Sequence, residues 1–148
     1  MCCDHIRHDE TTEELRACFT VMHQLRPHLP DENDFIKKVT RMRAENYALL
    51  VLWQEGIPVA LAGYRSQENL IYGRFLYVDD LIVTESCRSA GYGALLLQKA
   101  EKIADEKGCD RLVLDTGLDL ALAQRFYFRQ GMLTGAIGFS KILKVHEE

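Results

Sequence analysis

The 148-residue sequence lacks a long hydrophobic run, an excess of basic residues and a regular spacing of cysteines. Its longest apolar stretches, such as residues 47–53, are far shorter than the roughly 20 residues that a membrane-spanning helix needs. The formal net charge is −4, so no basic field over the whole chain favours nucleic acid. We therefore expect neither a membrane nor a nucleic-acid partner, and an anionic ligand would have to be held by local groups.

The five cysteines are an odd number without the spacing of a disulfide framework, and no apolar leader-like stretch follows Met1. This pattern is typical of a reduced, cytoplasmic protein. Cys2, Cys3, His5 and His8 cluster near the N-terminus, but no further spaced ligands accompany them, so we expect no metal site.

Linker-like segments are also missing, because the chain has only three prolines and shows no low-complexity stretch or internal repeat. Its length suits one domain that buries roughly 70% of its unfolded surface. Hydrophobic residues make up 47% and charged residues 27%, which is ordinary for a globular protein. We therefore predict a single domain over residues 1–148.

Hydrophobic periodicity predicts helices that alternate with strands, which indicates a mixed α/β fold with helices covering a sheet. Thr11 and Glu14 form a capping box that begins a first helix, which runs to about Leu25. A second helix is expected after its cap, Asp31. Two more are expected from about Gly91 to Lys107 and over Asp119–Gln130. The strands are expected over residues 3–8, 47–54, 58–64, 74–84 and 111–115, with one or two further strands over 132–145.

The third predicted helix, over residues 91–107, has an apolar face. We expect Leu95, Leu96, Lys99 and Ile103 to lie on its buried side. Gly108 suits the C′ position that ends the helix.

The segment from Leu81 to Ala94 is the most informative, because a hydrophobic strand ends, a polar loop turns, and a glycine-containing segment opens a helix. Such a loop directs several backbone N–H groups at one point, and the helix N-terminus adds partial positive charge. Gly91 and Gly93 have no Cβ to obstruct the approach of phosphate oxygens, and Arg88 can add a charged contact. The segment therefore predicts a phosphate-binding loop.

Three phosphate-binding patterns compete for this loop. A dinucleotide fingerprint needs a third glycine at position 96, where the chain has Leu96. A Walker loop needs Gly-Lys-Ser/Thr, which is absent. The pattern Arg/Gln-x-x-Gly-x-Gly/Ala is matched in full by Arg88, Gly91 and Gly93. The third pattern is therefore the one we adopt.

On this loop and a second motif, the chain resembles the GNAT superfamily of acetyl-CoA-dependent N-acetyltransferases. In the second motif Ala123, Tyr127 and Gly131 match the alanine, tyrosine and glycine of the family pattern, whereas Leu120 stands where asparagine is common. The resemblance covers most of the chain from residue 46 onward, and the two N-terminal helices also fit. Two further segments, Arg26-Pro27-His28-Leu29 and Tyr77-Val78-Asp79-Asp80-Leu81, resemble a branch of small bacterial members of the superfamily.

The resemblance implies a mostly antiparallel, mixed central sheet of six to seven strands flanked by about four helices. It implies acetyl-CoA or CoA as co-substrate, held in a V-shaped opening between the fourth and fifth strands. It also implies acetyl transfer to a primary amine of a small molecule or peptide, by direct attack in a ternary complex. Since relatives are commonly dimers, it is consistent with a homodimer.

Cofactor-binding positions follow by resemblance from the fourth strand, the loop and the second motif. They are Leu81, Ile82, Val83, Arg88, Ser89, Ala90, Gly91, Tyr92, Gly93, Ala94, Ala123 and Tyr127. The resemblance also makes the main-chain N–H near Ile82 the candidate for polarising the thioester carbonyl.

Acetyl transfer further needs a base for the amine and an acid for the departing thiolate. The resemblance makes Tyr127 the candidate acid. Asp79 and Asp80 are the candidate bases, with Asp80 slightly favoured. Because successive strand residues face opposite sides, at most one of the two carboxylates points at the substrate unless a β-bulge intervenes, as it often does in the family.

Two other functional classes compete with the enzyme. The first is a non-catalytic acyl-CoA-binding or regulatory module of the same fold, which the departure at Leu120 and the undecided base favour. The second is a nucleotide-binding redox domain, which Leu96 disfavours.

Overall fold

A computed structural model describes residues 5–144 of the chain. In chain order its elements are β1 (His5–His8), α1 (Thr12–Ala17), α2 (Phe19–Leu25), α3 (Glu32–Met42), β2 (Tyr47–Gln54), β3 (Ile57–Asn69), β4 (Gly73–Val83), α4 (Tyr92–Glu106), β5 (Arg111–Leu114) and α5 (Ala121–Arg129). Short 3₁₀ turns occupy Arg43–Glu45 and Glu85–Cys87. No helix among these residues combines the length and apolar character that crossing a bilayer requires.

The chain divides into two compact units. The first ends at Leu114 and contains the sheet with α1–α4. The second begins at Asp115 and contains α5 and the residues that follow it.

The first unit is built on a five-stranded sheet in the order β1-β2-β3-β4-β5. Neighbouring strands from β1 to β4 are antiparallel, and β5 pairs with β4 in parallel. The tight turn between β2 and β3 uses Glu55 and Gly56, both in the left-handed region. This arrangement confirms the mixed α/β class and its mostly antiparallel sheet.

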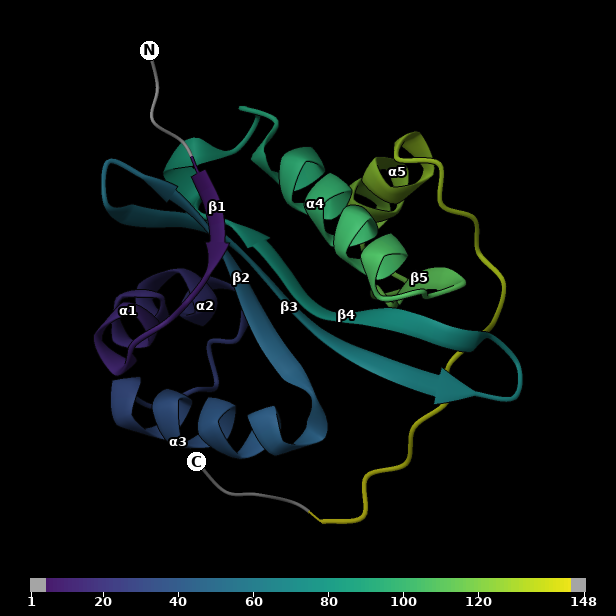
Figure 1. Ribbon diagram of the computed structural model, residues 1–148, viewed down its shortest axis with the longest axis horizontal. Helices are drawn as coiled ribbons and strands as arrows, with labels where there is room; N and C mark the ends of the chain where they lie inside the picture. Colours follow the sequence, from purple (N-terminus) through teal and green to yellow (C-terminus); the bar gives the residue numbers. More distant parts are fainter. Residues whose placement is uncertain (1–4, 145–148) are drawn as a thin grey trace. The chain divides into compact units, whose positions relative to one another are not determined.

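Helices cover both faces of this sheet (Figure 1). On one face, α1, α2 and α3 bury a core that includes Leu15, Phe35 and Leu49. On the other face, α4 packs Leu96 and its neighbours against a second core that includes Leu50. The alternation of Leu49 and Leu50 between the two cores explains why β2 reads as one continuous apolar run.

The helix starts expected from the sequence are present. The Thr11 hydroxyl accepts from the N–H of Glu14, and the Asp31 carboxylate accepts from the N–H of Asp34. The first predicted helix, however, is interrupted at Cys18, so residues 5–144 contain five α-helices where about four were expected.

The buried face of α4 differs from the expected one. It consists of Leu96, Leu97, Ala100, Ile103 and Ala104. Leu95, expected inside, is 44% exposed. Gly108 adopts a φ of 74° directly after the helix, as its predicted C′ position requires.

The strands expected over residues 132–145 are wrong for the part that the structure describes. No strand follows α5 up to residue 144, so the sheet has five strands rather than six to seven. Leu133, Ile137 and Phe139 are exposed on this segment. The alternating pattern gives the segment a strand-like face, but a strand forms only where a neighbour supplies the ladder of hydrogen bonds.

His8 yields a prediction about pH and stability. Its ring Nε2 lies 2.7 Å from the Tyr64 hydroxyl, and burial lowers the pKa of His8 below its ordinary value. The unfolded chain therefore binds this proton more readily, so the contribution of neutral His8 is complete above pH 6.5 and is lost as the pH falls through the lower, folded pKa. We expect His8→Gln to weaken the dependence of the free energy of unfolding on pH in this window, as measured by urea denaturation.

Tyr64→Phe serves as the control, because it removes the hydrogen bond and keeps the burial that dominates the shift. This variant should retain the wild-type dependence of the free energy of unfolding on pH. An equal dependence of the free energy of unfolding on pH in the wild type and in His8→Gln would contradict the assignment of this dependence to His8.

Candidate active site

The sheet opens between β4 and β5. The parallel ladder joins four residue pairs, from Phe75↔Arg111 to Val78↔Leu114. Strand β4 continues to Val83 and is paired over this stretch with β3 alone. Within residues 5–144, one edge of β4 therefore has no strand partner from residue 79 to 83, at the place where the resemblance implied the opening.

The phase of the β3–β4 ladder decides which amides face this unpaired edge. The N–H of Thr84 donates to the carbonyl of Val59 at 2.8 Å. Since opposed residues of an antiparallel pair alternate between bonded and non-bonded positions, the N–H of Ile82 also points at β3. The N–H groups of Leu81 and Val83 point the other way. Of the main-chain amides near Ile82, those of its two neighbours therefore face the unpaired edge.

The loop after β4 leads into the N-terminus of α4. Ser89 and Gly91 adopt left-handed backbone angles, with φ of 74° and 83°. No side chain caps α4, and a Cβ added to Gly91 would meet nothing within 4 Å. The first-turn amides have no acceptor within the helix, so open space beside an uncapped helix start suits a phosphate group.

Side chains anchor both ends of this loop. The Arg88 Nε donates to the carbonyl of Val83 at 3.2 Å, so the guanidinium lies where the unpaired edge meets the loop. The Gln54 Nε2 donates to the Tyr92 hydroxyl at 2.7 Å and thereby ties the start of α4 to β2. The predicted loop residues thus lie together, in the order Arg88–Gly91 in the loop and Tyr92–Ala94 in the first turn.

Asp79 and Asp80 lie at a β-bulge. Gly63 pairs with Asp80 and Tyr64 pairs with Val78, so Asp79 is the extra residue of β4. The β-bulge that the sequence analysis named as the condition for both carboxylates to face one side is present. It immediately follows the last β4–β5 pair, and it turns both carboxylates to one face of the sheet.

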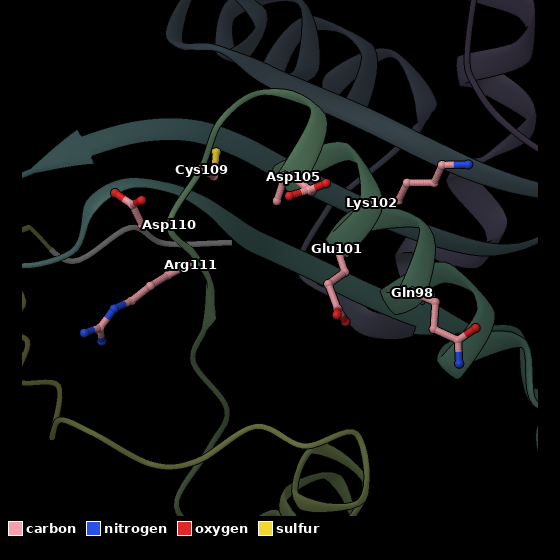
Figure 2. Close-up of a pocket in the computed structure, with 8 residues that line it drawn as sticks. Gln98, Glu101, Lys102, Asp105, Cys109, Asp110 and Arg111 are labelled. Carbon is pink, nitrogen blue, oxygen red and sulfur yellow. The ribbon is translucent and has the colours of Figure 1, made fainter.

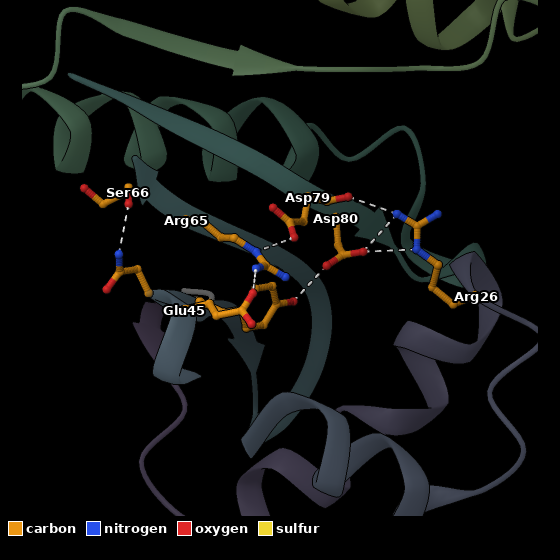
Figure 3. A network of polar contacts seen from close by, with 8 residues as sticks. Arg26, Glu45, Arg65, Ser66, Asp79 and Asp80 are labelled. Carbon is orange, nitrogen blue, oxygen red and sulfur yellow. Dashed lines mark hydrogen bonds and ion pairs between the residues drawn. The ribbon is translucent and has the colours of Figure 1, made fainter. Parts of the chain in front are cut away.

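Each of the two carboxylates is paired with an arginine (Figure 3). The Arg65 Nε donates to Asp79 Oδ2 at 2.9 Å. Arg26 donates from Nε to Asp80 Oδ1 at 3.0 Å and from Nη2 to the main-chain carbonyl of Asp79 at 2.9 Å. The Tyr47 hydroxyl donates to Asp80 Oδ2 at 2.8 Å. Both oxygens of Asp80 are therefore engaged.

Burial distinguishes the titrating groups of this network. Burial, which outweighs the pairing with Arg65, raises the pKa of Asp79, and Asp79 Oδ1 is buried without a hydrogen-bond partner among the described residues. Burial and the neighbouring Asp80 carboxylate raise the pKa of Tyr47 well above its ordinary value. Tyr47 is thus a hydrogen-bond donor at neutral pH, whereas Asp79 has one oxygen available to accept a proton.

Sequence reasoning did not assign Arg26, Tyr47, Gly63 or Arg65 to the site. Gly63 is required there, because a Cβ at this position would collide with the Tyr47 hydroxyl and lie 2.8 Å from Asp80 Oδ2. These residues come from the loop after α2 and from two strands, so no local motif brings them together. A signal was available only for Arg26, which directly precedes the helix-terminating Pro27.

The remaining predicted residues belong to the second unit. Ala123 and Tyr127 lie on α5, which Leu120 precedes without capping it by a side chain. Tyr127 packs against Phe126, with ring centroids 5.3 Å apart and planes at 66°. Gly131, directly after the predicted helix end at Gln130, has a φ of 86°.

A cavity of about 470 Å³ lies elsewhere, between the second half of α4 and the start of β5 (Figure 2). Its polar lining mixes Glu101, Asp105 and Asp110 with Lys102 and Arg111. It adjoins the end of β5 opposite to the unpaired edge, so it is separate from the site. Among residues 5–144, no group of three His, Cys, Asp or Glu side chains could hold a metal ion, and Cys2 and Cys3 lie outside this range.

Comparisons with known proteins agree with this geometry. The model of the acetyltransferase (GNAT) family matches residues 8–132. An uncharacterised N-acetyltransferase of Bacillus subtilis, YhdJ, is 31% identical over 123 residues, which are 83% of this chain and 87% of the relative. The chain therefore belongs to the GNAT acetyltransferase family and is an acyltransferase.

Solved structures show the same fold. The aminoglycoside N-acetyltransferase AAC(6')-Iy, solved in complex with CoA, has a TM-score of 0.85 at 17% identity, and the match covers 97% of both chains. An acetyltransferase of Agrobacterium tumefaciens described as putative has a TM-score of 0.82 at 22% identity, covering 93% of this chain and 99% of that one.

The Tyr47–Asp80 contact gives a prediction about stability. Tyr47→Phe removes only the hydroxyl and leaves Asp80 with one donor fewer. Because hydrogen bonds to charged groups contribute about 1.5–3 kcal/mol, we expect a loss of that order in the free energy of unfolding. Chemical denaturation measures it. Tyr72→Phe is the matched control, since among residues 5–144 no partner for the Tyr72 hydroxyl is found. An equal, small effect in both variants would contradict the contribution of the Tyr47 hydroxyl.

Proposed function

We propose that the protein transfers an acetyl group from acetyl-CoA to a primary amine by direct attack in a ternary complex. The observation that carries the proposal is the juxtaposition on β4 of an unpaired strand edge, an uncapped helix start and a bulge bearing two carboxylates. The first two features suit the amides and phosphates of CoA, and the third suits an amine. A structural relative solved with CoA bound supports the choice of co-substrate.

In the proposed reaction, the residues of this chain would bind the co-substrate and transfer protons. Acetyl-CoA, when bound, supplies the acetyl thioester. The loop and first turn of α4, over residues 88–94, would hold its pyrophosphate, and the outward amides of Leu81 and Val83 would donate to its carbonyl groups. Asp79 or Asp80 would receive the ammonium proton, and Tyr127 would donate a proton to the departing thiolate.

The acceptor is the amine of a small molecule or a peptide. We further propose that residues 1–148 act as one acetyltransferase domain in a bacterial cytoplasm, with a homodimer as an open option. The family match, which spans residues on both sides of Asp115, supports the single domain.

A non-catalytic CoA-binding module is the second candidate. It is favoured by the engagement of both Asp80 oxygens and by Leu120, which stands where asparagine is common in the family. Such a module would bind CoA as tightly as an enzyme does but would not acetylate any amine.

The co-substrate is tested by thermal unfolding with acetyl-CoA, CoA and NAD. A ligand that binds only the folded state, at 100 times its Kd, adds about 2.7 kcal/mol of stability, so both CoA compounds should raise the Tm and NAD should not. Arg88→Gln should weaken CoA binding roughly tenfold, as loss of one charged contact does. Arg16→Gln, on α1, is the control. A shift with NAD instead would redirect the assignment to a redox domain.

The catalytic roles are tested by steady-state kinetics with a panel of amines, following release of the free CoA thiol. Tyr127→Phe should lower kcat about 100-fold and leave CoA binding intact. Asp79→Asn and Asp80→Asn identify the base. The change that removes the base should lower kcat to a similar extent, and this loss of kcat should become smaller at high pH, where the amine is already deprotonated. Tight CoA binding by the wild type without turnover of any amine would favour the module.

A further inference from the structure

The C-terminal end of α2 is attached both to the loop that follows β4 and to β4 itself. The Gln24 side chain donates to the Thr84 hydroxyl at 3.0 Å and accepts from the N–H of Glu85 at 3.0 Å. Two residues later, Arg26 reaches the bulge. The loop toward α4 and the carboxylate pair are thus tied to the same end of one helix.

The backbone of Arg26 follows from its sequence. Pro27 disfavours helical angles in the residue before it, and Arg26 accordingly leaves the helix with φ −121° and ψ 71°. Its N–H still donates to the carbonyl of Met22 at 2.8 Å. The side chain therefore starts from a well-defined point and turns toward β4 instead of following the helix.

Arg26 makes a forked contact with the bulge. Nη2 lies 2.9 Å from both Asp80 Oδ1 and the carbonyl oxygen of Asp79, while Nε also donates to Asp80 Oδ1. One guanidinium thus fixes a side chain and the adjacent main chain. A lysine offers one point of attachment and cannot reproduce this fork.

Two donors hold Asp80, and they differ in solvent exposure. Tyr47 is buried, but the Arg26 side chain is 40% exposed, against 11% for its partner Asp80. The guanidinium is therefore at the solvent side of the carboxylate, where an incoming amine would arrive. Its position distinguishes Arg26 from Arg65, which is the more buried of the two arginines and also contacts Glu45.

We propose that Arg26 is a positioning residue for acetyl transfer, which holds the Asp80 carboxylate and the Asp79 carbonyl so that the bulge presents its acidic groups to the amine. The inference rests on the proposed function. A displacement of about 1 Å in a reacting group lowers rates by as much as 100-fold, which is why a residue without its own contact to the substrate can control kcat.

The test compares Arg26→Ala, Arg26→Lys and Arg16→Ala in the same amine assay. Arg16 is the matched control, because its side chain is 36% exposed and also forms an ion pair, with Glu32. We expect Arg26→Ala to lower kcat about 10- to 100-fold, with the KM of the amine changed less than about threefold. Arg26→Lys should be intermediate, and Arg16→Ala should match the wild type.

Two further readouts separate positioning from a general structural role. Millimolar guanidinium should restore part of kcat in Arg26→Ala and none in Arg16→Ala. The acid limb of the profile of kcat/KM against pH should also move to higher pH, because the charge of Arg26 lowers the pKa of Asp79, and without it this carboxylate is protonated more easily. The charged groups that act on Asp79 are Arg65, Asp80 and Arg26, and only Arg26 is changed.

An unchanged kcat in Arg26→Ala would overturn the inference. So would a loss of kcat that guanidinium does not restore and that leaves the acid limb in place, since the effect would then be structural. If Arg26→Ala fails to fold, Arg26→Lys decides by its kcat and pH profile. If the wild type acetylates an amine and both Asp80→Asn and Arg26→Ala keep its rate, only the inference about Arg26 is rejected. If the wild type binds CoA but acetylates no amine, the proposed catalytic function is rejected together with the inference.

Discussion

The site depends on the early end of one strand ladder. Strand β4 pairs with β3 along its whole length but with β5 only up to Val78. The backbone beyond this point keeps the rigidity of a central strand on one side and exposes hydrogen-bonding groups on the other. A strand edge of this kind binds extended chains readily. The bulge at Asp79 lies directly where the ladder ends, so the same local feature opens the edge and turns two carboxylates to one face.

The charges around the bulge are largely balanced within the chain. An acidic pair in a sequence suggests an open anionic subsite, but here Arg65 and Arg26 each neutralise one carboxylate. Removing a charge from water is unfavourable unless a partner compensates it, and half-buried pairs with forked or doubled contacts meet this condition. Under the proposed function, an acceptor would therefore meet a pre-organised polar network in place of free acidic groups. Selectivity for a strongly cationic amine does not follow from the two aspartates alone.

The sequence predicted the features that depend on local chemistry. The helix caps at Thr11 and Asp31, the strand over residues 47–54 and the glycine loop before α4 follow from residue types at fixed spacings, and all are present. Strand β3 is longer than expected, because its polar end is stabilised by pairing with β4 and not by burial. The segment after α5 shows the converse, since its alternating pattern finds no ladder up to residue 144. Tyr47, Gly63 and Arg26 could not be assigned, because their meeting at Asp80 depends on tertiary packing.

Contacts from other segments of the chain fix the orientation of the two carboxylates at the bulge. A bulge is locally adaptable, because its extra residue has no partner in the ladder. Left alone, Asp79 and Asp80 would sample several orientations, and like charges on adjacent residues would favour their separation. Groups from three separate segments prevent this: a hydroxyl from β2, a guanidinium from β3 and a second guanidinium from the end of α2. Gly63 leaves the space that lets the hydroxyl in. The precision of the site is therefore a property of the packing of helices on the sheet. Of its two arginines, Arg26 has the more exposed side chain.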